Sequence, residues 1–186
     1  MTDAQGWVAA ALGGDREAIT QMVEAHKNAV FNLCYRLLGE AGEAEDVAQE
    51  TFMRMYTRLR TYDSSRPFKT WLLAIATHAC IDRLRQRRLT WLSLDEPLPA
   101  ADVGALHDRA LGPEEALAHK EEQQRVQALL ARLAPGDRSV LVLRYWYDLS
   151  YDEIAEVTGA SVSSVKSRLF RARRELAGAL APEVMA

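Results

Sequence analysis

The sequence predicts an all-α fold made of two small helical domains joined by a flexible acidic linker. Apolar residues recur at helical spacing in both halves of the 186-residue chain, and 48% of the residues are hydrophobic, enough for a packed core. The few glycines and prolines gather at a handful of places and do not interrupt the periodic segments. We therefore expect helices throughout, with a helix-turn-helix in the C-terminal domain.

Three helices are predicted in the N-terminal half, at about 15–38, 43–59 and 68–88. Asp15 is placed to cap the first of them. A polar loop at 61–67 precedes the third helix, which starts near Phe68 and ends in a basic run at 82–88. Cys34 and Cys80 fall on apolar faces, so we expect two buried thiols and no disulfide.

The helical pattern fails between residues 92 and 113, where prolines, glycines and acidic residues replace it. This composition is typical of an extended linker. A long ordered loop inside one domain is disfavoured, since such loops are rare in compact domains. The predicted division is a first domain at 1–91, a linker at 92–113 and a second domain at 114–186.

A helix-turn-helix is predicted near the C-terminus. Ser150 and Glu153 form a capping-box signature that opens a short helix, and Gly159 suits the turn after it. Ser161 then caps a longer helix. The apolar run at 140–143, which alone could be a strand, fits a buried helix better because of its flanks.

The outer face of the longer helix is basic and carries small hydroxyl groups. Between residues 162 and 175 there are five Lys or Arg residues and one acidic residue, Glu175. Such a face suits the major groove of DNA, and a merely solvated face would mix both signs more evenly. The net charge of −3 hides this asymmetry. The local distribution of charge, and not the net charge of the chain, decides whether a surface binds DNA.

Several classes of function are disfavoured by the sequence. It shows no nucleophile–base pair, phosphate loop or metal-ligand spacing, so we expect no enzyme, no metal and no cofactor. No apolar run reaches membrane-spanning length and the N-terminus does not have the form of a signal peptide. The expected location is the cytoplasm, without membrane insertion.

Segments of both halves resemble a known family. EDVAQETF (45–52), FKTWLLAIA (68–76) and DRLR (82–85) resemble conserved region 2 of the sigma-70 superfamily, and 133–138, 143–145 and the helix-turn-helix resemble its region 4. Their order and spacing are similar to the extracytoplasmic-function (ECF) group of sigma factors, which keeps only these two regions. The resemblance implies a factor that directs promoter-specific transcription initiation by RNA polymerase.

The resemblance also implies three groups of site residues. Core polymerase binding falls on Asp46, Gln49 and Glu50. Recognition and melting of the −10 element fall on Tyr62, His78, Arg83, Arg85, Arg87 and Arg88. Recognition of the −35 element falls on Arg144, Ser163, Ser164, Lys166, Ser167, Arg168, Phe170 and Arg171.

Roles within these groups differ. Lys166, Ser167, Phe170 and Arg171 form one stripe expected to read bases, whereas Arg144 and Arg168 suit phosphates. His78 stands where family members often carry Asn, so it lines the flipped-base pocket or is a buried structural histidine, and the sequence leaves both open.

The implied partners are core RNA polymerase, through its β′ clamp helices and β flap, promoter DNA and an anti-sigma factor. The acidic linker would thread towards the RNA exit path or act as a plain tether. The alternative function is a stand-alone helix-turn-helix transcriptional regulator that binds duplex DNA without polymerase. Such a regulator needs neither the Asp46–Gln49–Glu50 surface nor the basic third helix, which disfavours it.

Overall fold

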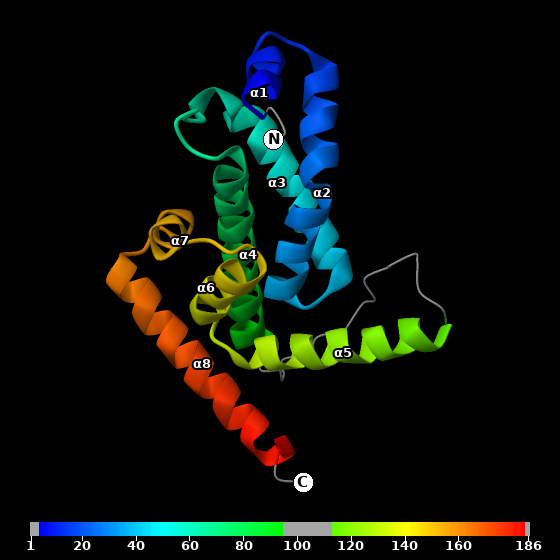
Figure 1. Ribbon diagram of the computed structural model, residues 1–186, viewed down its shortest axis with the longest axis vertical. Helices are drawn as coiled ribbons and strands as arrows, with labels where there is room; N and C mark the ends of the chain where they lie inside the picture. The colour runs from blue at the N-terminus through cyan, green and yellow to red at the C-terminus, as the bar shows by residue number, and fades with distance from the viewer. Residues whose placement is uncertain (1–3, 95–112, 185–186) are drawn as a thin grey trace.

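The computed structural model describes residues 4–94 and 113–184, and all regular structure in these residues is helical (Figure 1). The α-helices fall into an N-terminal half, α1 to α4, and a C-terminal half, α5 to α8, which confirms the predicted fold class. Their bounds are α1 Ala4–Leu12, α2 Arg16–Leu38, α3 Ala41–Arg58, α4 Phe68–Leu94, α5 Pro113–Arg132, α6 Pro135–Trp146, α7 Tyr151–Thr158 and α8 Val162–Val184, with a 3₁₀ turn, η1, at Leu59–Thr61. None of the described helices combines the length and apolar character that crossing a membrane requires.

Capping side chains set the ends of α2 and α3. The Asp15 carboxylate accepts amide N–H groups of the first turn of α2, as predicted, and Gly39 ends that helix with a left-handed φ of 85°. The Glu40 carboxylate accepts the N–H groups of Gly42 and Glu43 at 2.7 and 2.5 Å. This cap starts α3 two residues before the expected position.

Two features of the N-terminal half differ from the sequence-based expectation. The first helix, α1, was not predicted; it packs Val8 and Ala11 against the core. In addition, α4 continues to Leu94, past the basic run and into the first three residues of the expected linker. Arginine is a good helix former and is favourable near a helix C-terminus, so the basic run does not end the helix. The rest of the expected linker, 95–112, lies outside the described residues.

The helix-turn-helix is formed as predicted. Ser150 Oγ accepts the Glu153 N–H at 3.2 Å while the Glu153 carboxylate accepts the Ser150 N–H at 2.8 Å, a complete capping box. These bonds lower the pKa of Glu153 below its ordinary value. Gly159 takes a left-handed φ of 63° between α7 and α8. The apolar run at 140–143 is a fully buried part of α6 and not a strand.

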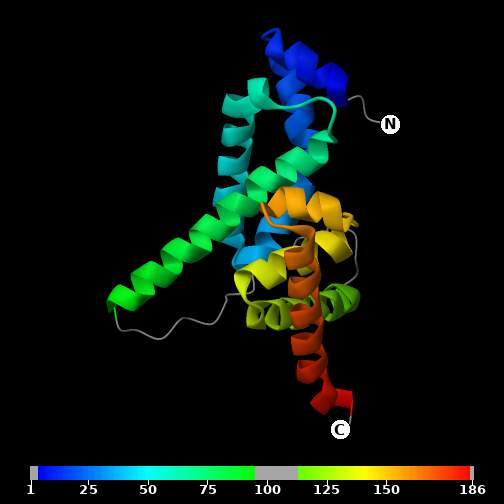
Figure 2. The same ribbon diagram turned by 90° about the vertical axis from the view of Figure 1, so that its left-hand side faces the viewer.

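The two halves of the chain touch each other. In the N-terminal half, α2, α3 and α4 pack side by side. In the C-terminal half, α8 packs against α6 and α7, and only its C-terminal end extends away from the other helices (Figures 1 and 2). Across the halves, α7 packs against α4, and both α5 and α6 pack against α2. The buried apolar side chains form one continuous core, which includes the free thiols of Cys34 and Cys80. The domain boundaries at 91 and 114 stay a prediction.

We predict that Ser150→Ala lowers the free energy of unfolding by about 1 kcal/mol, because the first turn of α7 loses its N-cap acceptor. Ser150→Asp keeps an acceptor at the N-cap and should retain most of that stability. Urea unfolding of both variants beside the parent protein measures the difference. An equal loss in the two variants would show that the cap does not stabilise this helix.

Candidate nucleic-acid interface

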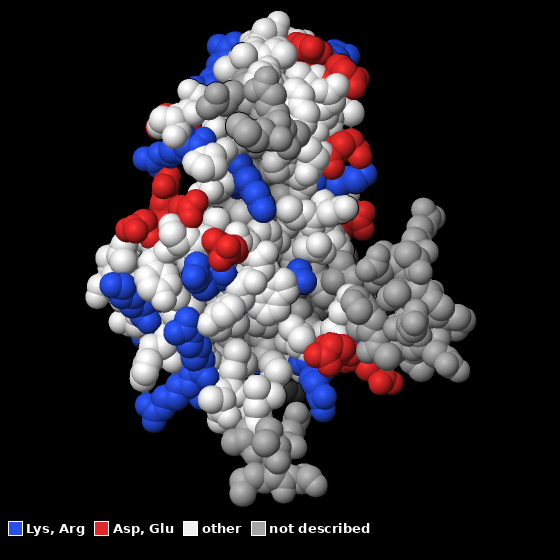
Figure 3. All heavy atoms as spheres, viewed as in Figure 1, with Lys and Arg blue, Asp and Glu red and all other residues white. Residues whose placement is uncertain are grey.

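The exposed face of α8 carries the predicted reading stripe. Lys166, Ser167 and Phe170 all face solvent, and Phe170 is 66% exposed, so it does not brace the helix against its own domain. The Ser167 hydroxyl donates to the Ser163 carbonyl at 3.0 Å. Ser164 is half-buried, and its N–H donates to the Ser161 hydroxyl that caps the helix. Figure 3 shows Lys and Arg side chains gathered over the region of α8.

Arg171 lies at the edge of this stripe and has a partner that the sequence did not reveal. Its Nη2 and Nε atoms donate to the two carboxylate oxygens of Asp137 on α6, at 2.7 and 3.0 Å. Asp137 is buried, whereas the Arg171 side chain is 59% exposed. The hydrogen bonds to Asp137 raise the pKa of Arg171. The guanidinium is therefore held in one orientation while part of it still faces solvent.

Arg144 and Arg168 are both engaged within the C-terminal half. Arg144 Nη1 donates to the Leu149 carbonyl at 2.8 Å, and its guanidinium lies over the Tyr151 ring. Arg144 thus braces the connection between α6 and α7. The Arg168 guanidinium lies against Gly136, where an added Cβ would approach Nη1 to 3.3 Å. Each keeps only part of its side chain available to a phosphate.

Tyr62 belongs to an aromatic cluster at the start of α4. Its ring packs edge-on against Phe68 at 5.4 Å and lies 5.2 Å from Trp71, and its hydroxyl donates to the Arg66 carbonyl at 2.5 Å. Phe68 is buried and Trp71 is half-buried, so Trp71 is mainly part of the packing. Partial burial of the side chain and the nearby Asp63 carboxylate raise the pKa of Tyr62. A base stacking here would meet a rigid aromatic surface.

His78 is exposed on α4, which excludes the alternative of a buried structural histidine. Its Nε2 lies 4.0 Å from the position that a Cβ at Gly159 would occupy. The turn of the helix-turn-helix therefore sits beside a predicted −10 residue.

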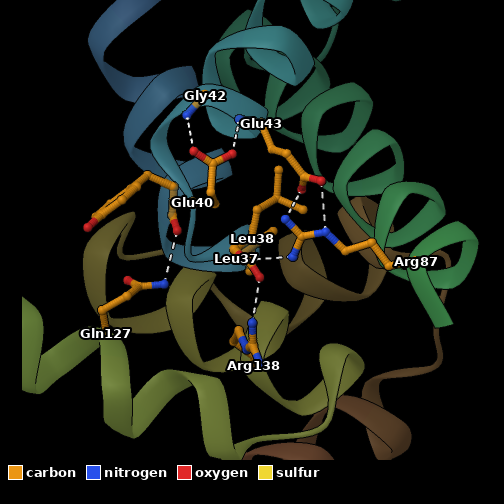
Figure 4. Close-up of polar contacts among 9 residues, drawn as sticks. Leu37, Leu38, Glu40, Gly42, Glu43, Arg87, Gln127 and Arg138 are labelled. Carbon is orange, nitrogen blue, oxygen red and sulfur yellow. Dashed lines mark hydrogen bonds and ion pairs between the residues drawn. The ribbon is translucent and has the colours of Figure 1, made fainter. Parts of the chain in front are cut away.

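Some arginines of the basic run of α4 face solvent, whereas Arg87 is bound to other helices. Arg85 and Arg88 are exposed and Arg83 is half-buried, so all three can meet DNA. Arg87 instead forms an ion pair with Glu43 and donates from Nη1 to the Leu38 carbonyl at 3.3 Å (Figure 4). Arg87 joins α4 to α3 and α2, and it is less suited to DNA than the sequence suggested.

The predicted polymerase-binding residues lie on one exposed face of α3. Asp46 and Gln49 face solvent, and Glu50 is paired with Arg54 at 2.6 Å. The sequence analysis missed two neighbours on this face: Met53 is 66% exposed and Tyr56 is 57% exposed. Their spacing of seven and ten residues from Asp46 places them on the same side of the helix, a signal that periodicity could have provided.

A helix-turn-helix whose second helix has a basic exposed face, together with a further helix, α4, that carries exposed arginines, is typical of a DNA-binding transcription protein. The family description Sigma-70 region 2 matches residues 22–90, and Sigma-70, region 4 matches residues 123–176. The chain belongs to the ECF group of the sigma-70 family of RNA polymerase sigma factors. As such a factor it directs promoter-specific transcription initiation.

Relatives support this assignment along nearly the whole chain. The chain is 35% identical over 167 residues to ECF RNA polymerase sigma factor SigW of Bacillus subtilis, covering 88% of this chain and 89% of SigW. It is 34% identical over 176 residues to RNA polymerase sigma-H factor of Pseudomonas aeruginosa, covering 91% and 89%.

Solved structures share the fold. CnrH in complex with the cytosolic domain of CnrY matches with a TM-score of 0.71 at 28% identity, covering 97% of this chain and 99% of that one. The sigma factor RpoE in complex with the anti-sigma factor NepR, from Bartonella quintana, matches with a TM-score of 0.68 at 22% identity, covering 84% and 92%, which shows the fold alone.

The Asp137–Arg171 pair generates a prediction. Asp137→Asn keeps the shape of the side chain but weakens its hydrogen bonds to the Arg171 guanidinium. It should therefore change the base preference at the same −35 position as Arg171→Ala does, by roughly ten-fold in relative transcription. Arg144→Ala, which loosens the α6–α7 connection, should lower output from all sequences alike. Transcription from a randomised −35 library with core polymerase measures both profiles. A uniform loss with Asp137→Asn would make Arg171 an anchor instead of a reader.

Proposed function

We propose that this sigma factor holds core polymerase with the exposed face of α3, reads the −35 element with α8 and opens the −10 element with α4. The observation that carries the proposal is the presence, in one chain, of an exposed basic recognition helix and a separate acidic and apolar face on α3. A protein that bound only duplex DNA would need the first and not the second. The stand-alone regulator is therefore disfavoured.

The α3 face combines the features of a protein-binding surface. Asp46 and Gln49 supply charge and hydrogen bonding, while Met53 and Tyr56 expose apolar area that would be buried against a partner. Aromatic residues and Met are enriched at such interfaces. We assign this face to the β′ clamp helices and assign contacts with the β flap to the C-terminal half.

The two DNA-reading surfaces use different chemistry. On α8, Lys166, Ser167 and Phe170 project from a regular helix, as major-groove reading requires. On α4, the aromatic Tyr62 and the exposed His78 stand N-terminal to Arg85 and Arg88. Stacking and hydrogen bonding would hold an unpaired base there while the arginines hold phosphates.

The remaining parts of the proposal concern setting and control. The chain acts in the cytoplasm, where polymerase works, and it contributes binding energy and no catalytic step of its own. RpoE, whose fold the chain shares, was solved with the anti-sigma factor NepR. We assign a protein of that kind as a third partner, beside core polymerase and promoter DNA.

The first prediction from this function concerns polymerase dependence. The chain alone should bind promoter duplex weakly, and together with core polymerase it should start transcription at defined sites. Asp46→Ala and Met53→Ala should each weaken polymerase binding at least about five-fold, because each removes a side chain from the centre of the contact. Glu24→Ala, an exposed carboxylate on α2, is the control. Tight, specific footprints without polymerase would overturn the function.

The second prediction concerns His78. Since this side chain is exposed, His78→Asn should leave the melting temperature unchanged and change the base preferred in the −10 element. A randomised −10 library transcribed with core polymerase reports the preference, and a thermal melt reports the stability. An unchanged −10 profile would remove His78 from the reading surface.

A further inference from the structure

Arg173 is an exposed cation on α8 that a tyrosine of α6 holds in place. Its Nε–H donates to the Tyr145 hydroxyl at 2.9 Å, and its guanidinium carbon lies 5.7 Å from the centroid of the Tyr145 ring. The hydrogen bond to Tyr145, with a smaller contribution from the Tyr151 hydroxyl, raises the pKa of Arg173. The guanidinium is therefore oriented by neutral groups while it faces solvent.

The charge of Arg173 is not cancelled by a carboxylate within the described part of the chain. Elsewhere in the structure, arginines pair with carboxylates, among them Arg54 with Glu50, Arg87 with Glu43 and Arg171 with Asp137. Arg138 has only carbonyl acceptors, but it is buried, whereas Arg173 is exposed. Arg173 thus combines a fixed orientation, an uncompensated charge and access to solvent.

These three properties suit the recognition of a phosphate. The bond to Tyr145 uses Nε and leaves terminal N–H groups of the fork for the oxygens of a phosphate. Tyr145 is 57% exposed, so it adds little to the core. Its hydroxyl accepts from Arg173 and still has its own hydrogen to donate, so both side chains can bind the same phosphate.

The position of Arg173 on α8 places it beside the face expected to read bases. It follows Lys166 by seven residues, which is close to two full turns, so the two side chains leave the helix on the same side. Seven residues span about 10 Å along the helix axis. The major groove is about 12 Å wide, so when Lys166 meets base edges, Arg173 is near the rim of the groove, where the sugar–phosphate backbone passes.

We infer that Arg173 and Tyr145 form a binding site for one phosphodiester group of the DNA backbone at the rim of the −35 element. Arg173 supplies the charge and the donor fork, and Tyr145 orients the fork and donates its own hydroxyl hydrogen. A backbone contact of this kind fixes the register of the C-terminal half on the duplex and reads no sequence. The inference rests on the proposed function, because the duplex is the one that α8 reads.

Replacing single phosphates tests the site. The full-length chain is assembled with core polymerase and bound to a promoter selected from the randomised −35 library. Each phosphate in and beside the −35 element is replaced, one at a time, by an uncharged methylphosphonate. For the parent protein, one position at the rim of the element should lower the affinity roughly five-fold, because a charge-assisted hydrogen bond is lost.

Arg173→Ala should make that same methylphosphonate position indifferent, because the protein side of the contact is already missing. With the unmodified promoter its affinity should be roughly five-fold below that of the parent. The slope of log affinity against log salt concentration should become less steep by about 0.9, while the base preferences of the −35 element stay unchanged. Tyr145→Phe keeps the charge, so it should keep the salt slope but weaken the effect of that methylphosphonate.

Arg174→Ala is the matched control, since it removes an exposed positive charge from the next position of α8. It should retain the sensitivity of the parent at the rim phosphate. The inference is overturned if Arg173→Ala leaves every methylphosphonate effect in place, or if Arg174→Ala removes the same effect. A changed −35 base preference in Arg173→Ala would make Arg173 a base reader and would also overturn it.

Thermal melts of the variants show whether they fold like the parent. Should Arg173→Ala melt early, Tyr145→Phe decides alone, and an undiminished methylphosphonate effect in that variant overturns the inference. Failure of the parent protein to start transcription with core polymerase would count against the proposed function. Transcription by the parent without any methylphosphonate effect that depends on Arg173 would count against the phosphate site alone.

Discussion

The need to pair the backbone groups at helix ends is the constraint on which the arrangement of these helices depends. Every α-helix leaves N–H groups at its start and carbonyl groups at its end that need partners. At the starts of α2, α3 and α7 these partners are local carboxylates and a hydroxyl, from Asp15, Glu40 and Ser150. At the end of α2 they come from the Gly39 N–H, from Arg87 on α4, and from Gln127 and Arg138 in the other half of the chain. The same requirement therefore shapes both the helices and their mutual arrangement.

The sequence predicted the features that local chemistry determines. The capping box at Ser150, the left-handed Gly159 and the start of α4 at Phe68 each depend on a few neighbouring residues, and all are found as expected. The apolar run of α6 was also assigned correctly from its flanks. By contrast, α1 is only nine residues long and consists mainly of small apolar residues, so its packing onto α2 decides its structure.

Long-range partners were the part of the site that sequence could not supply. Arg87 pairs with Glu43, 44 residues away in the sequence, and Arg171 pairs with Asp137, 34 residues away. From the sequence alone, either arginine could equally be a DNA contact, because the pairing depends on how the helices pack. The exposure of His78 could not be predicted either. The sequence was compatible both with a residue that lines the flipped-base pocket and with a buried structural histidine, and the structure shows the side chain exposed. Periodicity gives the face of a helix, whereas the neighbour on that face comes only from the tertiary structure.

A negative net charge is compatible with DNA binding because the arginines of α8 have different partners, and only some of these partners are charged. Asp137 compensates the charge of Arg171, whereas Arg173 donates to the neutral hydroxyl of Tyr145 and keeps its charge. A phosphate contact depends on charge that no neighbour has cancelled, and it gives the salt-dependent part of the affinity. Reading a base edge depends instead on a donor fork held in a fixed orientation. The pairing with Asp137 is therefore compatible with the proposed role of Arg171 as a base reader, because it fixes the orientation of the guanidinium that base recognition requires.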